Sequence, residues 1–181
     1  MKNSTNAGFE QDYNAQVGVT AGSLFIVGQS LSPHPTDHGE LLPTVDSIPA
    51  ALGVPSAGVA DTGFFREANI AGLQARGIDP YIAPGRTGHR RDWREQFAPR
   101  EPPPLPAGAT VREQMAHKLR TLAGRAIYPR RKCTVEPVFG IIKEVLGFRQ
   151  FSLRGLPKAA GEWCLVCVAY NLKRFHKLSL A

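Results

Sequence analysis

The order of strand-like and helix-like segments is the feature that most constrains this fold. Alternating and β-branched residues at 13–20 and apolar residues at 23–31 predict two strands. Only Ala21 and Gly22 separate them, so we expect an antiparallel hairpin. Further strands are expected at 57–61 and 80–83, and helices at 38–52, 66–76, 111–122, 134–147 and 157–177. This order of strands and helices predicts an α/β domain in which helices pack on a mixed sheet.

Two segments depart from regular structure. The helix expected at 38–52 contains Pro43 and Pro49, which predicts that it is short or broken. Residues 84–110 are rich in proline and arginine and show no apolar periodicity. We interpret them as an insertion that leaves the core, and a stiff linker is favoured over a proline-rich ligand for a partner domain.

Charge is distributed unevenly along the chain. Residues 1–99 hold 7 Lys and Arg against 10 Asp and Glu, whereas residues 100–181 hold 15 against 5. A basic half predicts a polyanionic partner such as DNA, and a solvated basic surface is the alternative. We find no signal peptide and no run of 18 apolar residues, so we expect a cytoplasmic protein without a membrane partner.

The two cysteines of a C-x-x-C pattern lie in an apolar helical run. Cys164 and Cys167 are therefore expected to be small core residues rather than metal or redox groups. The histidines show no convincing ligand spacing either, because Pro35 separates His34 from His38.

Asp61 ends the apolar segment expected as a strand at 57–61. Ligands gather at the carboxyl ends of strands in α/β sheets, and Gly63 permits a sharp turn that displays the carboxylate. The alternative is a turn residue that caps the following helix. The local sequence alone favours this alternative.

Glu136 lies near the start of the helix expected at 134–147. Thr134 is the expected N-cap, which places Glu136 where the helix dipole favours an acid. Lys143 lies seven residues further on, and hence on the same helical face. With the cations at 130–132, this pair could bind metal and phosphate together. The alternative is a dipole-favoured Glu on a solvated face.

Longer blocks of sequence resemble one family. Residues 128–143, Tyr-Pro-Arg-Arg-Lys-Cys-Thr-Val-Glu-Pro-Val-Phe-Gly-Ile-Ile-Lys, resemble the signature around the final Glu of DDE-type transposases of bacterial insertion sequences. Ala60-Asp61-Thr62-Gly63-Phe64 resembles the motif of the second catalytic Asp, with Phe64 where Tyr is more usual. Further similar blocks are Gly8-Phe9, Tyr13-Asn14-Ala15-Gln16, Gly147-Phe-Arg-Gln-Phe, Arg154-Gly155-Leu156, Glu162-Trp163 and Tyr170-Asn171-Leu172.

The resemblance implies a partial transposase catalytic domain over residues 8–177, with a ribonuclease H-like mixed sheet flanked by helices. It implies metal-dependent DNA strand cleavage and transfer, in which three carboxylates hold two Mg²⁺ ions. Asp61 and Glu136 would be catalytic residues and two of the metal ligands, within roughly 4–8 Å of each other. The implied DNA contacts are Tyr128, Lys143 and either Arg131 or Lys132.

One part of the family pattern is missing. The first catalytic Asp belongs on a strand ahead of Tyr13, and the residues before Tyr13 do not form it. Asp12 lies where the family usually has Gly, and we interpret it as a turn residue. We therefore expect a fragment that lacks the first strand and does not cut DNA alone.

Several partners follow from this interpretation. We expect DNA at transposon ends, and an upstream transposase fragment or a second copy of the chain as protein partners. Two other interpretations remain open: a DNA-binding remnant without catalysis, and an unrelated α/β interaction protein.

Overall fold

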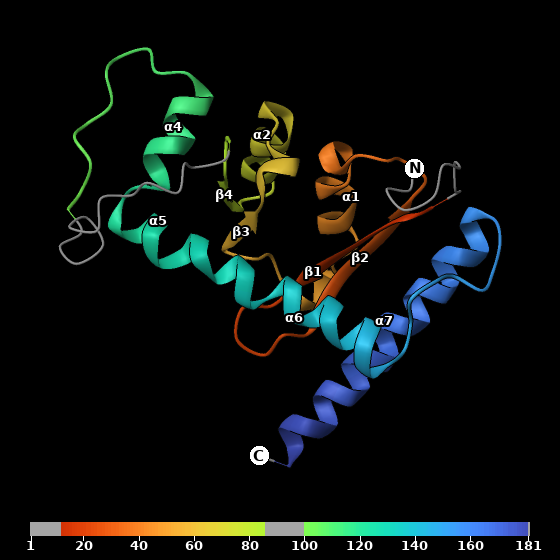
Figure 1. Ribbon diagram of the computed structural model, residues 1–181. Helices are drawn as coiled ribbons and strands as arrows, with labels where there is room; N and C mark the ends of the chain where they lie inside the picture. The colour runs from red at the N-terminus through yellow and green to blue at the C-terminus, as the bar shows by residue number, and fades with distance from the viewer. Residues whose placement is uncertain (1–11, 86–99, 181) are drawn as a thin grey trace. The chain divides into compact units, whose positions relative to one another are not determined.

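The computed structural model describes residues 12–85 and 100–180 (Figure 1). The chain divides into two compact units, and each is described here by itself. Unit 1 comprises Met1–Leu52 with Cys133–Ala181, and unit 2 comprises Gly53–Lys132. The Gly8-Phe9 motif and residues 86–99 of the expected insertion lie outside the described residues. In the described ranges, no helix is long and apolar enough to cross a membrane.

The sheet of unit 1 is the predicted antiparallel hairpin. Strand β1 (Asn14–Val19) pairs with β2 (Ile26–Ser32), and the register shifts between Gly18 and Val19. The connecting loop is longer than predicted, because the second strand begins at Ile26. Thr20 closes this loop by accepting a hydrogen bond from the Phe25 N–H at 3.0 Å.

The broken helix expected after the hairpin is confirmed. Helix α1 (Leu41–Asp46) is flanked by two 3-10 turns, η1 (Asp37–Gly39) and η2 (Ala50–Leu52). It packs on β2 at Gly28, where a Cβ atom would lie only 2.6 Å from the carbonyl oxygen of Thr44. This close approach requires glycine.

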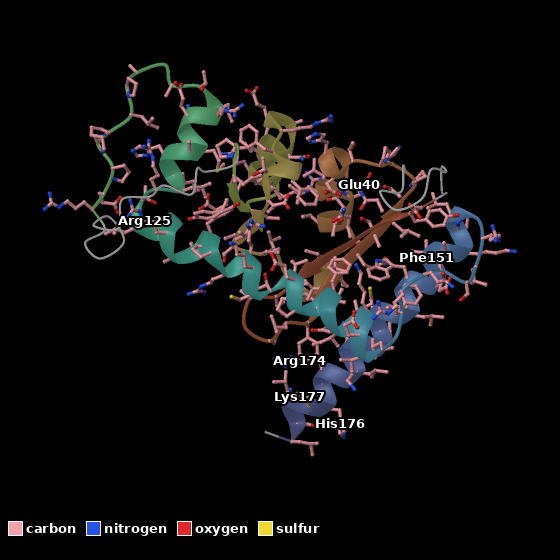
Figure 2. All side chains as sticks on the ribbon, viewed as in Figure 1. Glu40, Arg125, Phe151, Arg174, His176 and Lys177 are labelled. Carbon is pink, nitrogen blue, oxygen red and sulfur yellow. The ribbon has the colours of Figure 1, made fainter. Side chains whose placement is uncertain are left out.

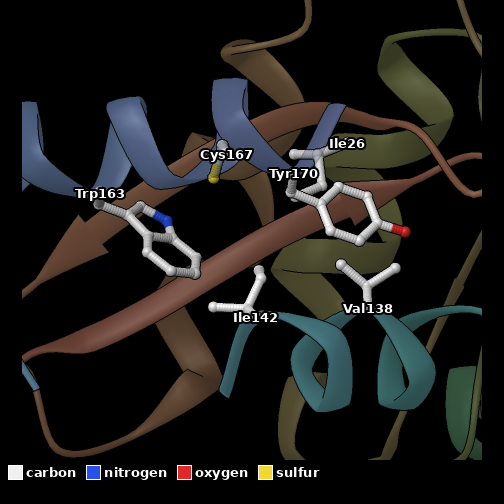
Figure 3. Packing of buried hydrophobic residues seen from close by; sticks show 6 residues of the cluster. All are labelled: Ile26, Val138, Ile142, Trp163, Cys167 and Tyr170. Carbon is white, nitrogen blue, oxygen red and sulfur yellow. The ribbon is translucent and has the colours of Figure 1, made fainter. Parts of the chain in front are cut away.

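The carboxy-terminal helices complete unit 1. The predicted helix at 134–147 begins as α6 (Val135–Gly140) and continues as a π-helical turn, η5 (Ile141–Val145). Helix α7 (Leu156–Ser179) packs on β2, and its Trp163 lies among the core residues (Figure 3). The buried core comprises Ile26, Val138, Ile142, Trp163, Cys167 and Tyr170.

The cysteine prediction is correct for only one residue of its pair. Cys167 is buried in the core, and this burial raises the pKa of its thiol to about 12. Cys164 is exposed. The prediction for Cys164 is wrong because the apolar run of α7 extends around to a face that points away from the core.

Unit 2 contains a parallel strand pair. Strand β3 (Ala57–Ala60) pairs with β4 (Asp79–Ile82), and α2 (Glu67–Ala75) lies between them in sequence and packs on β4. Lys118 donates to the Asp79 carboxylate and the Pro80 carbonyl, and its ammonium lies 4.2 Å from the centre of the Tyr81 ring.

The helix expected at 111–122 ends earlier than predicted, and a second helix that was not predicted follows it. Helix α4 (Val111–Lys118) begins with a capping box between Thr110 and Glu113. Thr121 then caps α5 (Leu122–Ile127), and the 3-10 helix η4 (Tyr128–Cys133) follows. The described residues before α4, 100–110, contain no helix or strand.

The predicted α/β class is confirmed. The described strands nevertheless form two separate two-stranded sheets, one antiparallel and one parallel, instead of one mixed sheet. Among these strands none joins the two pairs. The ribonuclease H-like topology and the domain bounds of 8–177 stay predictions.

Candidate functional site

Asp61 follows β3 directly and is half-buried in unit 2. Its Oδ1 accepts a hydrogen bond from the Gly63 N–H at 2.8 Å, which starts the 3-10 turn η3 (Thr62–Phe64). This is the turn that the local sequence favoured. The turn uses one carboxylate oxygen, so it fixes the orientation of Asp61 at the end of the strand.

Glu136 is the second residue of α6 and is exposed. Pro137 occupies the third position, where its missing N–H costs no helical hydrogen bond, as predicted. Thr134 precedes the helix, but its side chain makes no capping hydrogen bond. The negative side chain therefore lies beside the amino-terminal dipole of the helix, in solvent.

The predicted face shared by Glu136 and Lys143 stays a prediction, because the helix changes from α to π winding between them. Both residues are exposed, and so is Gly140 between them. Val138 and Ile142, which alternate with them, are 0% and 1% exposed. Lys143 belongs to the π-helical turn, a winding that is rare and often found at functional sites.

A group of basic residues leads into α6. The Arg131 guanidinium lies over the Tyr128 ring, 5.4 Å from its centre, in a cation–π contact. Lys132 is exposed at the next position. Arg131 is thus held against an aromatic ring, whereas Lys132 faces solvent, and either could meet a phosphate.

The candidate residues divide between the two units. Asp61, Tyr128, Arg131 and Lys132 belong to unit 2, and Glu136 and Lys143 belong to unit 1. The convergence of the Asp61 and Glu136 carboxylates therefore stays a prediction. Within residues 12–85 and 100–180, no group of three or more His, Cys, Asp or Glu side chains is arranged to hold a metal ion.

The segment at 147–153, which follows η5, is held against α7 by contacts that the sequence did not predict. The Phe148 and Phe151 rings pack edge to face with their centres 5.2 Å apart, and the centres of the Phe151 and Trp163 rings are 6.4 Å apart. The Glu162 carboxylate accepts the N–H groups of Ser152 and Leu153, each at 2.9 Å. These hydrogen bonds lower the pKa of Glu162. They hold the loop after the π turn to α7.

The Tyr-Asn pair of α7 is also structural. The Tyr170 hydroxyl donates to the Leu24 carbonyl at 2.9 Å. The Asn171 amide accepts the Ile26 N–H at 2.9 Å and donates to the Ile26 carbonyl at 2.8 Å, so it satisfies both backbone groups. Arg174, labelled in Figure 2, donates to the Ser23 carbonyl at 2.7 Å.

These α7 contacts hold the hairpin rather than a substrate. Trp163, Cys167, Tyr170 and Arg174 follow each other at spacings of 4, 3 and 4. That spacing was the available signal for one inward helical face. Sequence reasoning treated several of these residues only as parts of a family motif.

Comparison with protein families identifies a match in the second half of the chain. Residues 105–176 match a family model described as a transposase DDE domain. The matched segment runs from just before α4 into α7 and includes Glu136 and Lys143, whereas Asp61 lies outside it. It covers less than half of the 181 residues. Neither the curated proteins nor the solved structures give a significant match.

Proposed function

From the match of residues 105–176 to the transposase DDE domain, which confirms the predicted resemblance to a DDE-type transposase, we propose that this chain takes part in DNA transposition. The observation that carries the proposal is the position of Glu136. It lies inside the matched segment and is exposed on α6. The proposed substrate is DNA at transposon ends.

Asp61 and Glu136 are the proposed metal ligands. Carboxylate oxygens are the hard donors that Mg²⁺ prefers. A bound ion would polarise the phosphodiester and stabilise the leaving oxygen. Asp61 is suited to the role because the Gly63 N–H fixes one of its oxygens. Glu136 is suited because it is exposed beside cations that attract an anionic substrate.

The cations around Glu136 are the proposed phosphate contacts. Lys143 is exposed in the π turn that follows α6, and Lys132 is exposed just before α6. The Arg131 guanidinium, which lies over the Tyr128 ring, offers a planar cation that matches phosphate geometry.

We propose that the chain does not cleave DNA by itself. The family reaction needs three carboxylates, and the sequence assigns only Asp61 and Glu136. The third would come from another polypeptide segment, either an upstream transposase fragment or another protein chain. Such a segment would also supply the first strand that the resemblance implies.

The test separates catalysis from simple DNA binding. Fluorescence anisotropy with a labelled duplex should show binding that weakens as salt rises, because released counterions drive it. Replacing Lys132 and Lys143 together by Ala should reduce the salt slope by about two. Affinity that does not depend on salt would contradict a DNA function.

Metal binding is tested on the same protein. Titration calorimetry with Mn²⁺ or Mg²⁺ should give binding that weakens at least about tenfold in Glu136→Gln and in Asp61→Asn. Glu144→Gln is the matched control, since Glu144 is an exposed acid two turns away that pairs with Arg149. If the chain binds DNA but the three variants do not differ in metal affinity, the non-catalytic DNA-binding remnant is favoured. Strand cleavage by the purified chain with Mg²⁺ would contradict the proposed inactivity.

A further inference from the structure

The parallel strand pair of unit 2 has an edge at which both of its strands end, and we call it the carboxyl edge. The last paired residues are Ala60 of β3 and Ile82 of β4. Asp61 follows β3 directly, and residues 83–85 continue the chain beyond β4. Ligands in α/β sheets gather at the carboxyl ends of parallel strands. The surroundings of Asp61 at this edge therefore bear on what it can bind.

Helix α4 brings Arg112 to the carboxyl edge. Lys118 at the end of α4 donates to Asp79, the first residue of β4. At the other end of α4, a Cβ atom added to Gly85 would lie 3.2 Å from Nη2 of Arg112. The helix packs on β4 (Figure 1). It therefore runs antiparallel to the strand, with the Arg112 guanidinium beside the segment that leaves β4.

The fold makes little use of the Arg112 guanidinium. Arg112 is exposed, and among residues 12–85 and 100–180 it makes no hydrogen bond and no ion pair. Its neighbour Glu113 is engaged by Thr110 in the capping box of α4. Lys118 differs, because its ammonium binds Asp79 and the Pro80 carbonyl. One cation of α4 thus holds the helix to β4, and the other can bind an anion from solvent.

The separation between Asp61 and Gly85 suits a nucleic acid strand. Neighbouring strands lie about 4.8 Å apart, and each residue extends a strand by about 3.3 Å. Asp61 lies one residue past the last pair and Gly85 three, so their backbones are on the order of 10 Å apart. Successive phosphates of a DNA strand advance by about 3.4 Å along the helix axis. A strand that reaches Asp61 therefore passes Arg112 within about three nucleotides.

We propose that Arg112 is a DNA-binding residue, whose guanidinium binds a phosphate of the same strand that reaches Asp61. A guanidinium suits this role because two of its N–H groups can donate to one phosphate. Its positive charge also offsets the repulsion between the Asp61 carboxylate and the strand. The inference rests on the proposed function, and it adds a phosphate contact at the carboxyl edge to those around Glu136.

Fluorescence anisotropy of the full chain with a labelled duplex tests this contact. Arg112→Ala should lower the salt slope of binding by about one, because one phosphate contact is lost. Arg112→Lys should keep the slope but bind more weakly, since it retains the charge and loses the bidentate geometry. Arg120→Ala is the matched control and should leave the slope unchanged, because Arg120 is an exposed arginine just past the opposite end of α4. Circular dichroism should show that all three variants keep their helix content.

The effect of Asp61 on DNA binding tests whether Arg112 holds the strand beside it. Asp61→Asn keeps an oxygen that can accept the Gly63 N–H, so the turn is retained. In buffer with EDTA, this variant should bind DNA more tightly than the parent, because it removes a negative charge beside the strand. The gain should be at least about twofold smaller in the Arg112→Ala background, because the two sites share one strand. In the Arg120→Ala background the full gain should remain.

The outcomes separate this inference from the proposed function. If the parent chain binds DNA with a salt dependence but Arg112→Ala has the same slope as Arg120→Ala, Arg112 is not a phosphate contact and only this inference is overturned. An equal gain from Asp61→Asn in both arginine backgrounds would also overturn it, because Arg112 then acts on DNA away from Asp61. A parent chain whose DNA binding does not depend on salt contradicts the proposed function, and this inference with it.

Discussion

The side chain of Asn171 holds both backbone groups of Ile26 at the start of β2. Asn171→Ala should leave a partly buried N–H and carbonyl without partners, at a cost of about 1–3 kcal/mol. Urea unfolding measures this loss, with Lys173→Ala, an exposed neighbour on α7, as the control. If Asn171→Ala unfolds at the same urea concentration as the parent, the amide does not hold the hairpin.

The contribution of Glu162 to the stability of the folded state should depend on pH. The N–H groups of Leu153 and Ser152 lower the pKa of Glu162, so the folded state favours its ionised form. The resulting stability is present above the pKa of the unfolded chain and is lost as the pH falls through the lower, folded pKa. Glu162→Gln should therefore be less stable than the parent at pH 7, and this difference should shrink in acid. A difference that grows in acid would show that another group causes it.

How far single residues could be predicted depends on how local their environment is. The face shared by Glu136 and Lys143 was predicted from α-helical spacing alone, and it stays a prediction because Lys143 lies in a π turn. The turn at Asp61 follows from the sequence Asp-Thr-Gly, and the alternative that foresaw it is confirmed. The exposure of Cys164 was missed, because hydrophobicity shows that a helix is apolar but not which side its neighbours cover.

The separation of α4 from α5 is a packing effect at the element scale. Gly124 approaches the end of α4 so closely that a Cβ atom would lie 2.1 Å from the Lys118 carbonyl oxygen. Gly124→Ala should therefore destabilise unit 2, despite the higher helix propensity of alanine, by about 1–3 kcal/mol. Thermal unfolding tests this, with Gly140→Ala as the control, because no atom lies near a Cβ at that position. Stabilisation by both substitutions would mean that α5 does not need this contact.

Periodicity predicted the hairpin, α2, β3, β4 and the long α7 because these elements carry their pattern within themselves. It did not predict α5, which begins where the expected helix ends, or the π turn after α6. Both features depend on what a helix meets in space: Gly124 meets the α4 backbone, and Ile142 in the π turn packs into the core beside Trp163. Such contacts leave no periodic signal.

The whole molecule consists of two units with separate cores. Trp163→Ala should remove the centre of the unit 1 core and destabilise that unit by about 3–5 kcal/mol. Hydrogen exchange should then accelerate in β1, β2 and α7, while Leu73 and Ile82, both buried in unit 2, keep their protection. Uniform acceleration in both units would indicate a single cooperative structure instead.

Unit 1 is built from the two ends of the described chain, and this has a consequence for its synthesis. Ile26 and Asn171, which bind each other in the folded protein, are 145 residues apart in sequence. At roughly 5–20 residues per second, the ribosome takes on the order of ten seconds to make the segment between them. During that time the hairpin has no α7 to pack against. Unit 2, whose residues are contiguous, can already fold. We therefore infer that unit 2 folds first on the ribosome and that unit 1 assembles only after α7 has emerged.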